Sequence, residues 1–270
     1  MTLRFRRSLH TPVLTLTLLV TTACSSGSGK GTSDTGQDAA SKPDTGDSGP
    51  PETMHVPYGP GEDQWLNLYL ADADTPTPIY LFSHANGGTA DSVGGFVAEL
   101  NDVGISTISW ESVVLPDGGQ EDIQTGWSDA ELMLDWVREH AEIYNLDATR
   151  IIAGGRSRGS VFTWRLAHSG DPAIQGIYMF QALPDGVWQG DEWTPIAEVN
   201  ADSPPMKLTY KEPRYTEDGH DPDNGYAILD RYTELGIGDR AELAEDLGSE
   251  PGLYADIGVW CQELLAGTGE

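Results

Sequence analysis

Cationic residues are scarce in this sequence of 270 residues. Lysine and arginine together number 15, against 43 aspartates and glutamates, so the formal net charge is -28. Because such a surface repels phosphates, the composition argues against nucleic acid and anionic lipid headgroups as partners. The excess of carboxylates indicates a heavily solvated exterior instead.

Long hydrophobic runs are scarce as well. The apolar stretch near the N-terminus, from Pro12 to Val20, is too short to span a bilayer. Three arginines precede it, and small residues followed by Cys24 come after it. This arrangement resembles a bacterial lipoprotein signal, which implies a signal peptide over residues 1–23 and a lipid on Cys24. The resemblance therefore implies an extracytoplasmic protein that is anchored to a bacterial membrane through this lipid, without a transmembrane helix.

Cysteine is limited to two residues, Cys24 and Cys261. If Cys24 carries a lipid, Cys261 has no partner, and the fold cannot depend on an internal disulfide. The alternative is a Cys24–Cys261 bridge in an ordinary secreted protein.

Apolar residues are almost absent from residue 25 to about residue 53, where Ser, Gly, Asp, Thr, Lys and Pro dominate. A segment of this composition cannot bury a core, so we expect residues 24–54 to form a disordered tether. Residues 55–270 are then of the right length for a single folded domain.

Short β-rich apolar segments alternate with helical patterns in this domain. The expected strands are WLNLYL at 65–70, IYLFS at 79–83, ISTISW at 105–110, IIA at 151–153, GIYMFQA at 176–182 and MKLTYKE at 206–212. Helical patterns occur near 93–100, from a capping box at 128–131, after residue 157, at 226–235 and at 254–265. The alternation predicts an α/β fold with a mostly parallel sheet and helices on both faces.

The segment from Gly155 to Gly159, GRSRG, fits the pattern G-x-S-x-G. It lies between an expected strand and an expected helix, which is the context of a nucleophile elbow. Glycines suit the two outer positions because the tight turn leaves no room for Cβ atoms. The hydroxyl of Ser157 would then lie near a helix N-terminus, where a developing oxyanion is stabilised. The alternative is a glycine turn that only joins a strand to a helix.

Three segments resemble the α/β-hydrolases, and in particular their carboxylesterase and feruloyl-esterase-like branch. HANGG at 84–88 is similar to the oxyanion loop H-G-G-G of that branch. The run from Asp135 to Gly159 is similar to its helix, strand and elbow, and Lys211 to Gly225 to its acid loop. The resemblance implies an α/β-hydrolase fold with a minimal cap and no cofactor.

The resemblance also implies roles for individual residues. Ser157 would be the nucleophile, and the backbone N–H groups of Arg158, Asn86 and Gly87 would stabilise the oxyanion. Asp221 occupies the position of the acid in the family. The family role of His84 is to hold the oxyanion loop, although a plain buried histidine explains it equally well.

Other carboxylates compete with Asp221 for the acid role: Asp218, Asp223 and Asp185. This acidic cluster also suggests calcium, but it fails the EF-hand test. Gly225 occupies a ligand position, and Tyr232 stands where the bidentate glutamate belongs. We therefore expect no metal.

Histidine is missing from the position where the family places its base, after the last strand. The six histidines are His10, His55, His84, His140, His168 and His220, and the residue near the expected position is Tyr254. His10 belongs to the signal, and His55 lies at the end of the tether. His140 lies on the expected helix before the elbow. His168 lies about 16 Å along the helix from Ser157, at a rise of 1.5 Å per residue.

His220 is the remaining candidate for the base. Its loop normally holds the acid over the serine, and Asp218, Asp223 or Asp185 could orient it. Asp221 is a poorer orienter, because neighbouring side chains usually point apart.

Two functions follow from these residues. One is a serine esterase with a displaced histidine, and the other is a hydrolase fold that has lost acyl transfer and serves as a binding or scaffold module. The short connection between the strands at 176–182 and 206–212 leaves no room for a large cap, and Trp188 and Trp193 in it would wall an open site. We expect bulky or polymer-linked esters as substrates, such as acylated polysaccharide or aryl esters.

Overall fold

The computed structural model describes residues 52–112, 120–183, 194–215 and 219–267. The expected signal peptide and almost all of the tether lie outside the described residues. The same holds for five residues singled out above: Cys24, Asp185, Trp188, Trp193 and Asp218.

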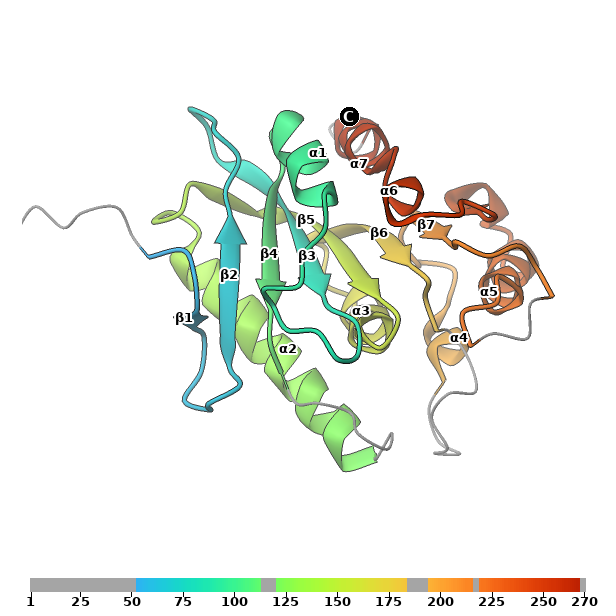
Figure 1. Ribbon diagram of the computed structural model, residues 1–270, viewed down its shortest axis with the longest axis horizontal. Helices are drawn as coiled ribbons and strands as arrows, with labels where there is room; N and C mark the ends of the chain where they lie inside the picture. Colours follow the sequence, from blue (N-terminus) through green and yellow to red (C-terminus); the bar gives the residue numbers. More distant parts are fainter. Residues whose placement is uncertain (1–51, 113–119, 184–193, 216–218, 268–270) are drawn as a thin grey trace, which may run out of the picture. The chain divides into compact units, whose positions relative to one another are not determined.

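The described part of the chain contains a sheet of eight strands in the order β1-β2-β4-β3-β5-β6-β7-β8 (Figure 1). The strands are β1 (Val56–Pro57), β2 (Trp65–Tyr69), β3 (Thr77–Ser83), β4 (Ser106–Trp110), β5 (Leu146–Arg156), β6 (Ile174–Phe180), β7 (Met206–Thr209) and β8 (Ala241–Ala244). β2 pairs antiparallel with β1 and β4, and the other pairs are parallel. The expected mostly parallel sheet is confirmed.

Helices cover both faces of this sheet (Figure 1). They are α1 (Phe96–Asp102), α2 (Gln120–His140), α3 (Gly159–Ala167), α4 (Pro195–Glu198), α5 (Asp223–Glu234), α6 (Glu250–Leu253) and α7 (Ile257–Gly267), with a short 3-10 helix at Gly238–Arg240. α2, α3 and α5 share one hydrophobic core with the sheet, and α1, α6 and α7 share the other.

β3 shows why the central strands are continuously apolar. Ile79 and Leu81 lie in the core beneath α2 and α3, whereas Tyr80 and Phe82 lie in the core beneath α1 and α7. Successive side chains of a strand point to opposite faces, so a strand that is covered on both faces needs an apolar residue at every position.

The prediction that a capping box at 128–131 begins a helix is wrong. α2 begins at Gln120, and Ser128 lies inside it with its hydroxyl donating to the carbonyl of Gln124 at 3.1 Å. A serine inside a helix can satisfy the hydrogen-bonding capacity of its hydroxyl group in this way. Gly126 also lies inside α2 without ending it. A Cβ at this position would lie 2.1 Å from the ring of Phe162, so the glycine lets α2 and α3 approach closely.

The helix expected at 254–265 is interrupted at its start. α6 ends at Leu253, Tyr254 is its C-cap, and α7 begins at Ile257. β1 and β8 are additional strands that the sequence patterns did not predict. Both lie at the edges of the sheet, where one side of a strand has no neighbour and its sequence need not be apolar.

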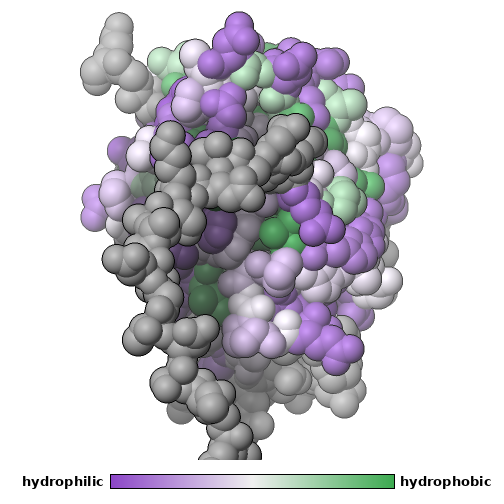
Figure 2. Space-filling model, turned by 90° about the vertical axis from the view of Figure 1, so that its left-hand side faces the viewer, coloured by the Kyte–Doolittle hydropathy of each residue, from purple (hydrophilic) through white to green (hydrophobic). Residues whose placement is uncertain are grey.

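No helix in the described ranges has the length and apolar character needed to cross a membrane. Figure 2 views the molecule from the β1 side, and the described residues on this surface are mostly hydrophilic. A hydrophilic surface agrees with the large excess of carboxylates in the sequence.

Candidate active site

Ser157 lies at a strained turn between β5 and α3. Its φ angle is 51°, in the left-handed region that non-glycine residues rarely adopt. A Cβ at Gly155 would lie 2.4 Å from Oγ1 of Thr163, and one at Gly159 would lie 2.0 Å from the carbonyl oxygen of Ser83. The two glycines of the motif therefore permit close packing of strand against helix, as the sequence predicted.

Hydrogen bonds hold this turn from both sides. The Ser157 N–H donates to the carbonyl of Phe180 at the end of β6, at 3.1 Å. The Ser157 carbonyl accepts the hydroxyl of Ser160 at 2.6 Å, and that hydroxyl in turn accepts the N–H of Leu183 at 2.9 Å. Ser160 thus ties the elbow to the chain beyond β6, a role that its position in the motif does not reveal.

His220 lies beside the candidate nucleophile. Its Nε2 atom is 2.8 Å from the Oγ atom of Ser157, although 63 residues separate the two in the chain. The half-buried His220 lies in the loop between β7 and α5. This distance allows Nε2 to accept the hydroxyl proton directly.

Three of the other histidines have partners elsewhere. His55 is exposed, and its Nε2 atom is hydrogen-bonded to Oδ1 of Asp91 at 3.0 Å. The Nδ1 atoms of His140 and His168 donate to backbone carbonyls one helical turn earlier, each at 2.8 Å. Burial also lowers the pKa of His168. His220 is the histidine that the structure brings to Ser157.

The carboxylates near His220 differ in their contacts. Oδ1 of Asp221 accepts the N–H of Asp223 at 2.8 Å, at the start of α5. Oδ1 of Asp223 accepts Nε of Arg214 at 2.6 Å, so this carboxylate serves an ion pair. Asp218 and Asp185 lie outside the described residues. The identity of the acid therefore stays a prediction.

The expected oxyanion loop forms a turn after β3. The N–H of Gly88 donates to the carbonyl of Ala85 at 3.2 Å, and Gly87 has a φ angle of 75°. A turn with positive φ at its third residue favours glycine there and leaves the second position free for Asn86. Asn86 and Gly87 are exposed, so this turn lies at the surface of the molecule.

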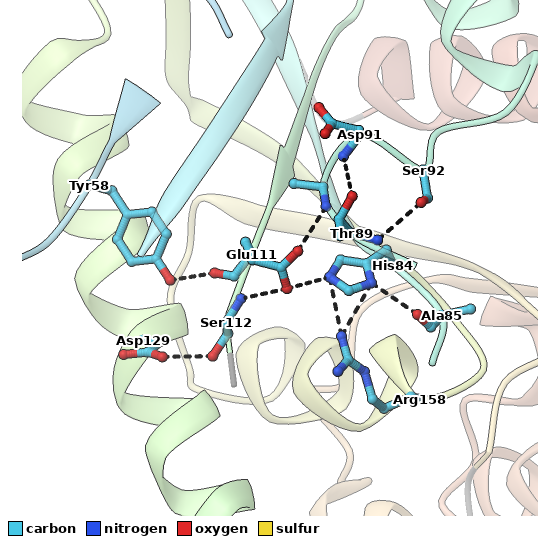
Figure 3. A network of polar contacts seen from close by, with 11 residues as sticks. Tyr58, His84, Ala85, Thr89, Asp91, Ser92, Glu111, Ser112, Asp129 and Arg158 are labelled. Atoms are coloured by element: carbon cyan, nitrogen blue, oxygen red, sulfur yellow. Dashed lines mark hydrogen bonds and ion pairs between the residues drawn. The ribbon is translucent and has the colours of Figure 1, made fainter. Parts of the chain in front are cut away.

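A buried polar network lies beneath this turn (Figure 3). Nε2 of His84 donates to Oε1 of Glu111 at 2.8 Å, and Nδ1 lies 2.9 Å from the carbonyl oxygen of Ala85. Both ring nitrogens thus have partners within this network, whereas Nε2 of His220 contacts Oγ of Ser157. Nη2 of Arg158 lies 3.2 Å from each ring nitrogen.

Glu111 was not identified from the sequence. It directly follows the buried strand β4, and the residue itself is buried at 6% exposure. The available signal was a charged residue directly after the strand expected at 105–110, because buried carboxylates are rare unless they have partners.

A pocket of about 250 Å³ lies at the carboxyl ends of β3, β5 and β6. Its lining includes the aromatic rings of Phe82, Phe96, Phe180 and Tyr254 and the charged groups of Arg156 and Glu250. Tyr254 thus stands in the pocket wall, near the position where the base was expected. The pocket borders the elbow, because Arg156 directly precedes Ser157 and the Phe180 carbonyl accepts the Ser157 N–H.

The charged groups of this pocket form a cluster with the neighbouring Lys211. Glu250 pairs with both Arg156 and Lys211. Burial alone would raise the pKa of Glu250, but the hydrogen bonds and charges of Lys211 and Arg156 outweigh it and lower the pKa. The carboxylate thus links α6 to the sheet in its ionised form.

The strand order, the strained elbow between β5 and α3 and the histidine at its serine define an α/β-hydrolase fold. No protein-family model matches the sequence, and no curated protein sequence matches it. The chain is similar to solved structures, however.

Three of these structures are esterases or related hydrolases. A carbohydrate esterase from gut microbiota, in truncated form, has a TM-score of 0.64 and 14% identity, over 80% of this chain and 96% of that chain. Esterase 2 of Thermogutta terrifontis, with propionate bound, has a TM-score of 0.61 and 17% identity, over 81% and 95%. An acetyl ester-xyloside bifunctional hydrolase from Caldicellulosiruptor lactoaceticus has a TM-score of 0.60 and 15% identity, over 81% and 97%. At these identities the likeness is one of fold.

Proposed function

We propose that the protein is a serine hydrolase that cleaves carboxylic esters, with Ser157 as nucleophile and His220 as general base. One observation carries this proposal: the distance of 2.8 Å between Oγ of Ser157 and Nε2 of His220. The base comes from the loop before α5 instead of the segment after the last strand.

The reaction would follow the order of acyl transfer. Oγ of Ser157 attacks the ester carbonyl while its proton passes to Nε2 of His220. The backbone N–H groups of Arg158, Asn86 and Gly87 would donate to the oxyanion of the tetrahedral intermediate. The alcohol leaves with the proton from His220. Water then attacks the acyl-enzyme, His220 takes a proton from it, and the acid is released with Ser157 regenerated.

The carboxylate that orients His220 is proposed to be Asp218 or Asp185, with Asp221 less suited because it is the direct neighbour of His220. Asp223 is the weakest candidate, because it already accepts from Arg214. Changing each of the four to asparagine tests this assignment. The orienting carboxylate is the one whose loss lowers kcat by about 10⁴-fold, the loss known when a triad aspartate becomes asparagine. Four unaffected variants would contradict a triad.

The pocket beside the elbow is proposed to bind the acyl part of the ester. An apolar cavity of about 150 Å³ holds a benzene ring, so about 250 Å³ leaves room for a ring with a short linker. Acylated polysaccharide and aryl esters are the proposed substrates, and two similar structures are described as a carbohydrate esterase and an acetyl ester-xyloside hydrolase. Equal turnover of alkyl, aryl and sugar esters would contradict this choice.

The lipid anchor on Cys24 is proposed from the resemblance of residues 1–24 to a lipoprotein signal. It would hold the domain on the extracytoplasmic side of a bacterial membrane. Metabolic labelling with an alkyne fatty acid tests it. Label should enter the parent and be lost in Cys24→Ser, and an unlabelled parent would exclude the anchor.

A second candidate function is a binding or scaffold module without acyl transfer. The observation that favours it is Tyr254 near the usual position of the base. A fluorophosphonate probe separates the two functions. Labelling of the parent that disappears in both Ser157→Ala and His220→Ala supports the esterase. An unlabelled parent supports the binding module, and labelling that survives His220→Ala excludes His220 as the base.

A further inference from the structure

We propose that Glu111 is a positioning residue that holds both halves of the oxyanion hole through one buried carboxylate. This inference rests on the proposed function, since the oxyanion hole is part of it. Glu111 itself does not touch the reacting atoms. It acts through the residues that carry the N–H donors.

The carboxylate of Glu111 binds both ends of the oxyanion loop (Figure 3). Its Oε1 atom accepts Nε2 of His84 at 2.8 Å, at the start of the loop. Its Oε2 atom accepts the backbone N–H of Ala90 at 3.1 Å, at the end of the loop. The turn that contains Asn86 and Gly87 is thus closed at its base by a single side chain.

The second half of the hole is connected to the same carboxylate. Arg158, whose backbone N–H is the other expected donor, has a buried side chain whose Nη2 lies 3.2 Å from both nitrogens of His84. Burial lowers the pKa of Arg158, whereas the negative charge of Glu111 raises it. The anion therefore helps to keep this guanidinium charged and in place next to His84.

The backbone of Glu111 is itself held firmly. Its N–H donates to the carbonyl of Trp65 in β2 at 2.9 Å, and its carbonyl accepts the hydroxyl of Tyr58 at 2.6 Å. Burial, followed by the charges of Asp129 and Glu111, raises the pKa of Tyr58, so this hydroxyl stays a donor. The carboxylate thus projects from a rigid strand end.

An amide at position 111 could not make the same contacts. Three groups donate to the carboxylate: Nε2 of His84, the N–H of Ala90 and the N–H of Ser112 at 3.1 Å. Glutamine has one acceptor oxygen and one NH₂ group, so at least one of these donors would face another donor. At 6% exposure of Glu111, water has little access to replace the lost bond.

Asp129 provides a matched control in the same network. It is buried at 4% exposure, and it accepts the hydroxyl of Ser112 and Nε2 of Gln64, each at 2.6 Å. These partners lie outside the oxyanion loop. Asp129→Asn therefore removes a buried charge at a similar depth without changing a contact of His84 or Ala90.

The test compares Glu111→Gln, Glu111→Asp and Asp129→Asn in the full chain by ester kinetics. Both Glu111 variants should lower kcat by about 10- to 100-fold, less than the roughly 100- to 1,000-fold loss on deleting an oxyanion donor. KM should change by less than about threefold, because the interaction strengthens in the transition state. Asp129→Asn should retain kcat within about threefold.

Hydrogen exchange of the peptide spanning residues 84–92 gives a readout that needs no activity. Exchange should become faster in both Glu111 variants, chiefly at the Ala90 amide, and stay unchanged in Asp129→Asn. The inference is overturned if exchange is unchanged in the Glu111 variants, or if Asp129→Asn loses as much kcat as they do. A parent without esterase activity but with this exchange pattern would overturn the proposed function and retain the positioning role. Glu111→Asp, which keeps the charge but is shorter, serves if Glu111→Gln does not fold.

Discussion

The proposed proton acceptor of Ser157 is His220, which lies 63 positions later in the chain. Its loop is the one that the fold normally uses for the acid. The sequence identified His220 by excluding the other histidines, and the structure brings the two side chains together. Sequence reasoning could reach this pair because both residues are chemically distinctive. Glu111 was missed because its role depends on contacts with His84 and Ala90, which are made only after folding.

Gly159 gives the first prediction at the residue scale. In Gly159→Ala the added Cβ would meet the backbone carbonyl of Ser83 at 2.0 Å, which no side-chain rotation can relieve. We expect a loss of about 2–4 kcal/mol in the free energy of unfolding, as for severe overpacking. Urea denaturation measures it.

The control for this prediction is Gly219→Ala, where a new Cβ would find nothing within 4 Å. Its free energy of unfolding should stay within about 0.5 kcal/mol of the parent value. Equal stabilities of the two variants would show that the close contact at Gly159 can relax.

At the scale of single elements, the sequence patterns predicted the buried strands more accurately than the ends of helices and the edge strands. The run IYLFS was recognisable because β3 is covered on both faces, as Ile79 and Tyr80 show. β8 escaped prediction because it is a short, partly exposed edge strand. The start of α2 was misplaced because Ser128 bonds within the helix and Gly126 packs against Phe162. Such tertiary contacts override local signals and cannot be read from neighbouring residues alone.

The docking of α7 gives a prediction at this scale. Asp256, just before α7, pairs with Lys207 of β7 and accepts the hydroxyl of Tyr178 at 2.7 Å. Burial would raise the pKa of Asp256, but its bonds to Lys207 and Tyr178 outweigh this and lower the pKa. Burial would likewise lower the pKa of Lys207, yet Asp256 and Glu242 raise it.

Because the folded state lowers the pKa of Asp256, its contribution is present above the unfolded pKa and is lost as the pH falls through the folded value. The contribution of Lys207 is present below its unfolded pKa and is lost at strongly alkaline pH. Asp256→Asn should therefore lower the free energy of unfolding at pH 7 by about 1 kcal/mol, discounted for the exposure of Asp256. The difference should shrink in acid, and urea denaturation at both pH values checks this. A difference that is constant with pH would contradict the ion pair.

At the scale of the whole molecule, Cys261 reports on global opening. Its side chain is fully buried in the core beneath α7, and burial raises the pKa of its thiol. In the Cys24→Ser protein, maleimide should leave Cys261 unmodified in native buffer and react with it fully in urea, since thiolate and access are both required. Intact mass measures the modification, and rapid native labelling would show that α7 opens locally.

The net charge of -28 acts on the whole molecule as well. Carboxylates that repel one another destabilise the compact state, and salt screens this repulsion, with a Debye length of about 10 Å at 0.1 M. The midpoint of thermal unfolding should therefore rise as sodium chloride increases from low to moderate concentration. Differential scanning calorimetry checks this, and a midpoint that falls with salt would show that attractive ion pairs dominate.

His220 lies before α5, and the pocket is lined in part by residues after β8. The proposed proton transfer and the lining of the pocket, which the fold usually assigns to one segment, therefore belong to two segments here. Tyr254 and Glu250, at the end of the chain, line the pocket, whereas the proposed acid–base chemistry resides between Ser157 and His220. Substitutions after β8 should thus reshape the proposed acyl pocket while the contact between Ser157 and His220 is preserved. For the proposed esterase, the carboxyl-terminal segment is therefore where the chain can adapt to a new ester without rebuilding its reactive pair.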